Sequence, residues 1–288
     1  MARTVKADLW APEVWQQLAT EAFKNKLIVA ASSATVENTT LVGQPGDTIV
    51  FPSWMNMSEI EDIDENDVLE VEKLTQKARR ATIKEAGKAF GISDQAKLIG
   101  LGDAQQEAVR QFGILTQRKI DRDVIAAATA TTVGGVTYAD GTTATDTAPM
   151  TTTLTGGYTW ENLVSLGLMF EDGWDPAMFT GLFINSADSE IFLLDEKFLQ
   201  ANQTSAGNVT INRGVIGTKN GLSIFITNQL APGKGLLLRP GALGIIRKRY
   251  PLVEFDRDIL ARTDVVALNM HYGTSRLADD RVVDITLA

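Results

Sequence analysis

The sequence contains no cysteine and only one histidine, His271, among its 288 residues. Without cysteine, the chain has no disulfide bonds, no thiolate nucleophile and no cysteine-bound metal. A single imidazole has no second imidazole or thiolate beside which it could bind zinc, so we expect His271 to pack or hydrogen-bond as part of a strand. The composition therefore argues against zinc and thiol chemistry.

Long hydrophobic runs are also missing. No stretch approaches the ~18–20 apolar residues that cross a bilayer. The short apolar run at 27–31 follows two lysines, but it is shorter than the ~7–15 residues of a signal-peptide core. We therefore expect a protein that begins at its own Met1, is made in the cytoplasm and has no membrane partner.

Basic residues are the minority charge: 27 Lys and Arg stand against 36 Asp and Glu, for a formal net charge of −9. An acidic surface repels phosphate backbones, so tight electrostatic binding of nucleic acid is disfavoured. The chain is otherwise ordinary for a globular protein, with 44% hydrophobic and 22% charged residues. It is long enough to bury a substantial core in one large or two modest domains.

Two helices and a short strand are predicted in the first half of the chain. Residues 11–31 follow a helical pattern, and residues 48–51 form a β-rich run after a Pro-Gly turn. Asp103 is a candidate N-cap for the longest helical pattern, over 103–128. Its apolar face repeats at steps of three or four residues: Val109, Phe112, Thr116, Ile120, Val124 and Ala127.

The second half favours strands. Residues 129–159 include 13 threonines in 31 positions, which is typical of strands and loops. A compact α/β pattern follows, with helices expected near 163–170 and over 186–199 and buried strands at 181–185 and 223–227. Alternating apolar and polar residues after 253 predict long strands.

Motifs for chemistry fail on inspection. Asp62, Asp64 and Asn66 imitate a calcium loop, but its glycine position holds Asp67 and its closing glutamate position holds Lys73. Glycine-rich phosphate loops are incomplete, and the carboxylate pairs lie in hydrophilic runs where water keeps them ionised. We therefore predict no catalytic residue, no cofactor and no metal site.

One polarised stretch calls for a different explanation. Residues 58–72 carry eight acids and no base, whereas residues 73–90 carry six bases and one acid. If 43–90 forms a two-stranded arm, each limb of about 20 residues would reach roughly 60 Å at ~3.3 Å per residue. An isolated hairpin is marginally stable, so this arm would need a surface.

We expect the charged limbs to neutralise each other or to meet a neighbouring copy, although a solvated surface loop stays an open alternative. The residues expected to make contacts between subunits are Glu59, Glu61, Asp62, Asp64, Glu65, Lys73, Lys77, Arg79, Arg80 and Lys84.

The order of these parts resembles the major capsid protein of tailed bacteriophages, with its Hong Kong 97-type α+β fold. The stretches that carry the resemblance are GDTIVFPSW, EVEKLTQKARRATIKEAGKAFGISD, EAVRQFGILTQRKIDRDVIAA and WDPAMFTGLFINSADSEIFLL. The resemblance implies an N-terminal arm, an extended β-hairpin loop, a peripheral domain with a spine helix, and an axial domain. The N-terminal arm would be residues 1–42, and the extended loop would be 43–90. The peripheral domain would combine 91–158 with 247–288 and contain the spine helix over 103–128. The axial domain would be 159–246.

The resemblance also implies a function. Such proteins assemble as pentamers and hexamers into an icosahedral shell around double-stranded DNA, which they hold without sequence-specific contacts. We expect a virion protein, synthesised in the host cytoplasm, with a portal among its partners. Only a short segment precedes the charged hairpin, so a fused scaffold is not expected. Whether a separate scaffolding protein is required stays open.

Two other interpretations stay open. An encapsulin-like nanocompartment shell shares the fold but encloses an enzyme instead of a genome. A soluble α/β enzyme that uses a carboxylate pair is the more remote alternative, because the sequence offers it one histidine and no phosphate loop.

Overall fold

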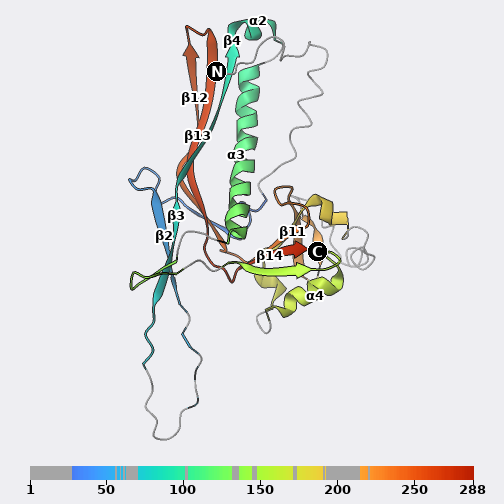
Figure 1. Ribbon diagram of the computed structural model, residues 1–288. Helices are drawn as coiled ribbons and strands as arrows, with labels where there is room; N and C mark the ends of the chain where they lie inside the picture. Colours follow the sequence, from blue (N-terminus) through green and yellow to red (C-terminus); the bar gives the residue numbers. More distant parts are fainter. Residues whose placement is uncertain are drawn as a thin grey trace.

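The computed structural model has three parts: a long body, a compact α/β part beside one end of it, and a narrow arm that runs away from both (Figure 1). The described residues are 28–55, 57–58, 60, 62, 71–100, 103–131, 136–144, 148–170, 174–190, 192, 215–219 and 221–288. Of the helix expected over 11–31, only the last four residues are described, and they are not helical. Within the described residues, no helix is long and apolar enough to cross a membrane.

The body is built on a four-stranded sheet that joins strands from both halves of the chain. Its order is β1-β12-β13-β4, with β1 parallel to β12 and the other neighbours antiparallel. Helix α3 (Ala104–Thr129) runs alongside the long strands, and the short helix α2 (Asp94–Ile99) follows β4 at the far end (Figure 1). The strands are β1 (Thr35–Asn38), β4 (Lys84–Ser93), β12 (Leu243–Asp258) and β13 (Thr263–Arg276).

Helix α3 confirms the prediction made for 103–128. Asp103 is its N-cap, and its Oδ1 accepts hydrogen bonds from the backbone N–H groups of Gln105 at 3.0 Å and Gln106 at 3.2 Å. Such a cap contributes about 1 kcal/mol to helix stability. The predicted face is buried at Phe112, Thr116, Ile120 and Val124, and only partly buried at Val109 and Ala127.

The compact part contains a six-stranded mixed sheet in the order β7-β14-β11-β8-β10-β9. Helix α4 (Trp160–Leu168) begins at the N-cap Thr159 and buries Leu163 and Leu166 against an apolar core that includes strand residues of this sheet. The strands predicted at 181–185 and 223–227 are confirmed as β8 and β10. The bounds are β7 (Met150–Leu154), β8 (Gly181–Ile184), β9 (Val215–Lys219), β10 (Leu222–Ile226), β11 (Lys234–Leu238) and β14 (Val282–Leu287), with 3-10 turns η4 (Pro176–Met178) and η5 (Ser186–Ser189).

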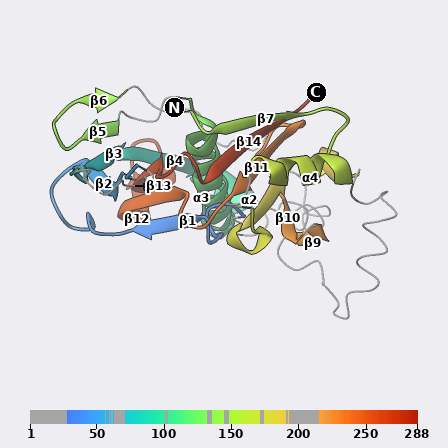
Figure 2. The same ribbon diagram turned by 90° about the horizontal axis from the view of Figure 1, so that it is seen from below.

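The arm belongs to a third sheet, in the order β2-β3-β5-β6. Strands β2 (Thr48–Trp54) and β3 (Gln76–Thr82) form the arm itself. The small hairpin of β5 (Val136–Tyr138) and β6 (Thr143–Ala144) adds to β3 from the side, as the view from below shows (Figure 2).

The sheets cross the boundaries expected from the sequence. Residues 84–90, expected in the returning limb of the arm, instead pair with β13 in the body. β7 and β14, expected in the peripheral domain, lie in the six-stranded sheet, where β14 pairs with β11 and β7 pairs with β14. Strand β12 already begins at Leu243, inside the segment expected to be axial. Of the helix expected over 186–199, the described residues show the 3-10 turn η5 and then α-helical conformation at Glu190 and Phe192. The remainder lies outside the described residues.

Candidate assembly interface

The arm is a hairpin, as predicted. Its strands pair in register from Thr48 opposite Thr82 to Trp54 opposite Gln76. The pairing continues outward: the Met55 N–H donates to the Thr75 carbonyl at 3.0 Å. Further out, the Ser58 hydroxyl and backbone N–H donate to the carboxylate of Glu72 at 2.7–3.2 Å. These hydrogen bonds hold the pKa of Glu72 below its ordinary value.

The charges of the arm are not arranged as expected. Residues opposite the basic side chains Lys77, Arg79 and Arg80 are the uncharged Ser53, Phe51 and Val50. In the sequence the acidic run falls between β2 and β3, and most of it lies outside the described residues. The interpretation that an acidic limb neutralises a basic limb across the hairpin is therefore wrong for the paired strands.

The ten predicted contact residues fall into three groups. Asp62, Lys73 and Arg80 are exposed, and Lys77 is half-buried. Two others are used inside the subunit: Arg79 is buried against Asp279, and Lys84 forms an ion pair with Asp123 at 2.7 Å. The remaining four, Glu59, Glu61, Asp64 and Glu65, lie outside the described residues.

The contact residues expected from the sequence were all charged, and the exposed apolar side chains of the arm were not among them. Ile60 and Val71 are 100% and 97% exposed, and Trp54, at the end of β2, is 61% exposed. Met57 and Leu74 are also exposed. Ile60 and Val71 alternate with acids in the sequence, so the average over that stretch reads as hydrophilic and hides them. Large exposed apolar groups gathered on one projecting element are typical of a surface that binds a partner.

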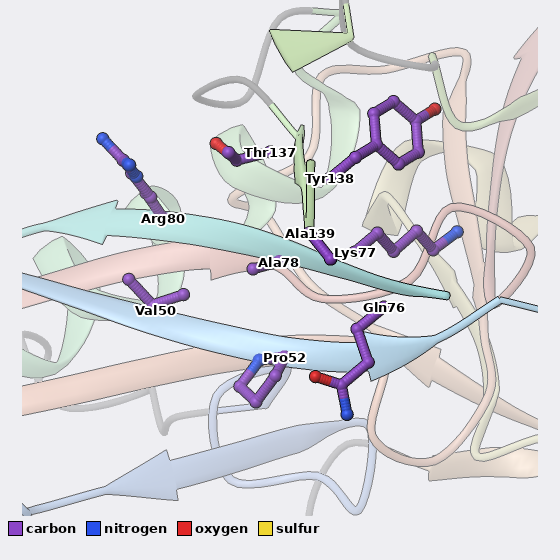
Figure 3. Close-up of a pocket in the computed structure, with 9 residues that line it drawn as sticks. All are labelled: Val50, Pro52, Gln76, Lys77, Ala78, Arg80, Thr137, Tyr138 and Ala139. Atoms are coloured by element: carbon purple, nitrogen blue, oxygen red, sulfur yellow. The ribbon is translucent and has the colours of Figure 1, made fainter. Parts of the chain in front are cut away.

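A shallow hollow lies on the arm where β5 joins β3 (Figure 3). The Ala139 N–H donates to the Gln76 carbonyl at 3.0 Å and holds the two elements together. The lining contains no carboxylate and no imidazole, so it offers no acid–base pair for catalysis. It consists of Val50, Pro52, Gln76, Lys77, Ala78, Arg80, Thr137, Tyr138 and Ala139.

Helix α3 carries two buried aspartates that hydrophobic periodicity did not predict. Asp121 Oδ1 accepts hydrogen bonds from the backbone N–H groups of Val29 at 2.9 Å and Ala30 at 2.8 Å. Burial raises the pKa of Asp121, and these hydrogen bonds only partly oppose it. The Asp121 carboxylate thus ties the segment that begins at Ile28 to α3, and Val29 also packs in the same apolar core as Ile120 and Val124.

Asp123 lies two residues further on and receives charged partners. Its carboxylate contacts Lys84 Nζ at 2.7 Å, Lys119 Nζ at 2.9 Å and the hydroxyl of Tyr272. Burial works to raise its pKa, but the hydrogen bonds from Lys84, Tyr272 and Lys119 outweigh burial, and the pKa of Asp123 is lowered. This site joins α3, β4 and β13.

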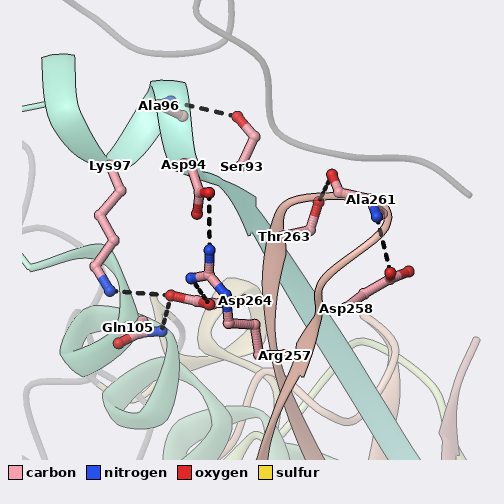
Figure 4. A network of polar contacts seen from close by, with 10 residues as sticks. All are labelled: Ser93, Asp94, Ala96, Lys97, Gln105, Arg257, Asp258, Ala261, Thr263 and Asp264. Carbon is pink, nitrogen blue, oxygen red and sulfur yellow. Dashed lines mark hydrogen bonds and ion pairs between the residues drawn. The ribbon is translucent and has the colours of Figure 1, made fainter.

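At the far end of the body, charged side chains brace the turn between β12 and β13 (Figure 4). Asp264 contacts Lys97 Nζ at 3.0 Å and Arg257 Nη1 at 2.9 Å, and Arg257 also reaches Asp94 at 2.9 Å. The Lys97 hydrogen bond is the main cause that lowers the pKa of Asp264. The braced turn exposes Ile259 and Leu260 to solvent.

His271 has the structural setting expected for it. It lies in β13 and its Nε2 is 3.8 Å from Glu85 Oε2. In the part of the chain that the structure describes, no group of three or more His, Cys, Asp and Glu side chains could hold a metal ion.

Comparison with known proteins decides what this architecture belongs to. The profile of a family described as phage capsid protein matches residues 76–282. The chain belongs to this family. It is also 29% identical over 278 residues to the major capsid protein of Staphylococcus phage phiMR11, covering 96% of this chain and 92% of that protein.

Solved structures agree on the fold of this capsid protein. The structure of Mycobacterium phage Che8 has a TM-score of 0.68 at 14% identity, covering 96% of this chain and 97% of that one. The cyanophage Pam1 capsid has a TM-score of 0.67 at 12% identity, covering 98% of both chains. The cyanophage P-SCSP1u capsid has a TM-score of 0.64 at 15% identity, covering 100% of this chain and 93% of that one.

The Hong Kong 97-type α+β fold is therefore confirmed. The chain is a structural protein of the phage shell, not an enzyme, and its place is the virion. Nothing in these comparisons favours the nanocompartment alternative.

Proposed function

We propose that copies of this capsid protein form pentamers and hexamers that close into an icosahedral shell, and that the arm is the main link between neighbours. One observation carries this proposal: the arm leaves the body and presents exposed apolar side chains, Ile60 and Val71 above all, to solvent. Such side chains gain about 25 cal/mol per Å² when a second surface covers them. A neighbouring copy supplies that surface in every subunit of a shell.

Charge has the second role at this contact. Asp62, Lys73, Lys77 and Arg80 are at least partly exposed and surround the apolar groups in sequence. Exposed pairs contribute only about 0.2–1 kcal/mol each, so they set register and exclude wrong partners more than they hold subunits together. Glu59, Glu61, Asp64 and Glu65 are proposed to act in the same way. Arg79 and Lys84 act from inside their own subunit.

The division into parts follows from this use of the arm. Residues 1–42 would be the N-terminal arm and 43–90 the extended loop with its root. The peripheral domain would hold the spine helix and the long strands, and 159–246 would make most of the axial domain. The shared sheets described above would join these parts into one rigid subunit.

Further partners are proposed from the family. The shell would enclose double-stranded DNA without sequence-specific contacts, because a chain of net charge −9 repels phosphate. A portal would occupy part of the shell, and a separate scaffolding protein would guide its assembly. Synthesis would take place in the host cytoplasm.

Shortening the arm tests the proposal. Because Met55 and Thr75 are hydrogen-bonded, residues 56–74 can be replaced with an Asn-Gly turn that leaves β2, β3 and Arg79 in place. We expect circular dichroism and thermal stability near those of the natural chain, and no closed particles by sedimentation and negative-stain microscopy. Normal shells from this variant would refute the proposed role of the arm.

Point variants separate apolar contact from arm length. The double variant Ile60→Ser with Val71→Ser should also reduce particle yield. Val42→Ser is a matched control, because Val42 is exposed but lies outside the arm strands, in the segment that leads into β2. Equal particle yields from the control and the double variant would show that apolar contact by the arm is unimportant.

A further inference from the structure

The root of the arm is held by a cluster of charged side chains that are buried within the subunit. They therefore have a role other than direct contact with a neighbouring copy. We call Arg79, Asp279 and Arg276 the arm mount. The side chain of Arg79 in β3 is 4% exposed, and that of Arg276 at the end of β13 is 0% exposed. The Asp279 carboxylate lies between them: Oδ2 pairs with Arg79 Nη2, and Oδ1 accepts from Arg276 Nε at 2.7 Å.

The mount also holds the C-terminal end of the spine helix. Arg276 Nη1 donates to the carbonyls of Ala128 at 2.9 Å and Ala130 at 2.6 Å. Carbonyls at a helix C-terminus lack partners within the helix, and a cation there is favoured by the helix dipole. α3 has no basic residue in its own last turn, so Arg276, at the end of β13, supplies that cation. One aspartate therefore connects the arm, β13 and α3.

A second contact lies three residues further along β3. A Cβ atom on Gly273 of β13 would be 2.7 Å from the carbonyl oxygen of Thr82 and 3.6 Å from the Cα of Ile83. No side chain fits at that distance, so the backbone of the arm root lies directly on the backbone of β13 at Gly273. The two contacts are about 10 Å apart along the strand, at ~3.3 Å per residue.

We infer that Asp279 and Gly273 are positioning residues for assembly, which set the direction in which the arm leaves the body. The inference rests on the proposed function, because direction matters only if the arm meets another copy. From Thr82 to Glu72 the arm extends about 33 Å, so a 10° swing at the root moves its outer part by about 6 Å. That displacement exceeds the ~4 Å range of a side-chain contact, so a loosely held arm would miss its site.

Spin labels can measure this direction in the full-length subunit before assembly. The chain has no cysteine, so cysteines placed at the exposed positions Ser53 on the arm and Gln117 on α3 take label alone. We expect a narrow distance distribution in the natural background. Asp279→Asn keeps the shape of the side chain but removes the charge shared by two guanidinium groups. We expect it to broaden the distribution at least twofold while circular dichroism stays unchanged.

The same variant should reduce the yield of closed particles by about tenfold, which corresponds to about 1.4 kcal/mol. Glu254→Gln is the matched control. It changes the net charge by the same amount and breaks the exposed contact with Arg249 at 3.8 Å, so distances and yield should stay as in the natural chain. Gly273→Ala tests the second contact without touching any charge, and should shift the mean distance and lower the yield.

The outcomes are distinguishable. Unchanged distance distributions in both Asp279→Asn and Gly273→Ala would overturn the inference that these residues set the direction of the arm. Broadened or shifted distributions with normal shells would overturn its role in assembly and leave the proposed function intact. Should Asp279→Asn fail to fold, Gly273→Ala decides, because it preserves every ion pair. A natural chain that forms no particles would count against the proposed function itself.

Discussion

Asp121 and Asp123 lie two residues apart on α3, yet their surroundings move their pKa values in opposite directions. Asp121 is buried among backbone N–H groups, and burial raises its pKa. Asp123 meets two lysines and a tyrosine hydroxyl, which together outweigh burial and lower its pKa. A raised carboxyl pKa weakens the folded state as pH rises, whereas a lowered one weakens it as pH falls.

Ionised Asp121 makes the folded chain less stable, and this effect develops as pH rises from the ordinary pKa of 3.8 through the raised pKa. Asp121→Asn cannot ionise, so the variant should not show this effect. The asparagine oxygen can still accept from Val29 and Ala30. We expect the variant to be at least as stable as the natural chain near pH 7, measured by urea unfolding of the subunit. Asp121→Ala is the contrast: it leaves two buried N–H groups without an acceptor and should cost about 1–3 kcal/mol. A less stable asparagine variant near pH 7 would contradict this account.

Asp123→Asn should behave in the opposite way. The stabilisation from Asp123 is present above the ordinary pKa of 3.8 and is lost as pH falls through the lowered value. Losing the charge near pH 7 leaves Lys84 and Lys119 without their carboxylate and should cost about 1–3 kcal/mol. Urea unfolding near pH 7 and at a pH below the lowered pKa of Asp123 measures both limits, and the two proteins should converge in acid. Lys119→Gln, which removes one partner only, should lose less.

At the scale of the element, β3 shows how alternation divides two neighbouring arginines. Successive side chains of a strand point to opposite faces. Arg79 is buried in the mount and Arg80 is exposed. A simultaneous reversal of Arg79, Arg80 and Lys84 would therefore mix folding defects with assembly defects, because Arg79 and Lys84 make ion pairs inside the subunit.

Single reversals separate the two effects. Arg79→Glu would face Asp279 with a like charge in a buried site and should destabilise the subunit by about 3–5 kcal/mol. Arg80→Glu should leave thermal unfolding nearly unchanged, because Arg80 is exposed, and its effect should fall on particle yield. Differential scanning fluorimetry of the two variants gives the comparison. Equal losses of stability in the two variants would contradict the assignment of Arg79 to the buried face of β3 and Arg80 to the exposed face.

The sequence predicted those elements whose signals are local. The cap at Asp103 and the period of three to four residues identified α3, and short apolar runs identified β8 and β10. The partner of a strand is not a local property: nothing within residues 84–90 says that they pair with β13 instead of continuing the arm. The hairpin of the arm was found, but with its charges wrongly paired.

For the interface, prediction failed where burial and charge occur together. Arg79 and Asp279 look like surface residues in a hydropathy pattern, and only the approach of β3 to the end of β13 makes them a buried pair. Ile60 and Val71 were hidden for the opposite reason, since the acids around them made their segment read as solvated. Both errors arise because hydropathy is averaged over residues adjacent in the sequence, whereas burial depends on residues that are adjacent in the folded structure.

At the scale of the whole molecule, the net charge of −9 sets the expected behaviour toward nucleic acid. Free subunits should bind duplex DNA weakly at physiological salt, because few phosphates can be neutralised and few counterions released. Fluorescence anisotropy with a labelled duplex, repeated at low salt, measures this. Tight binding at physiological salt would mean that a basic surface outweighs the overall charge.

The position of the C-terminal strand has a consequence for synthesis. β14 (Val282–Leu287) lies between β7 and β11, and β1 pairs with β12 so that Thr35 is opposite Leu243. Neither large sheet can be completed until nearly the whole chain has left the ribosome, and pairings so distant in sequence form slowly. During that interval the arm residues are already outside, with their apolar side chains uncovered and no finished body behind them. Nascent subunits on one messenger are thus exposed to premature association, and a chaperone that shields them until release would raise the yield of usable protein.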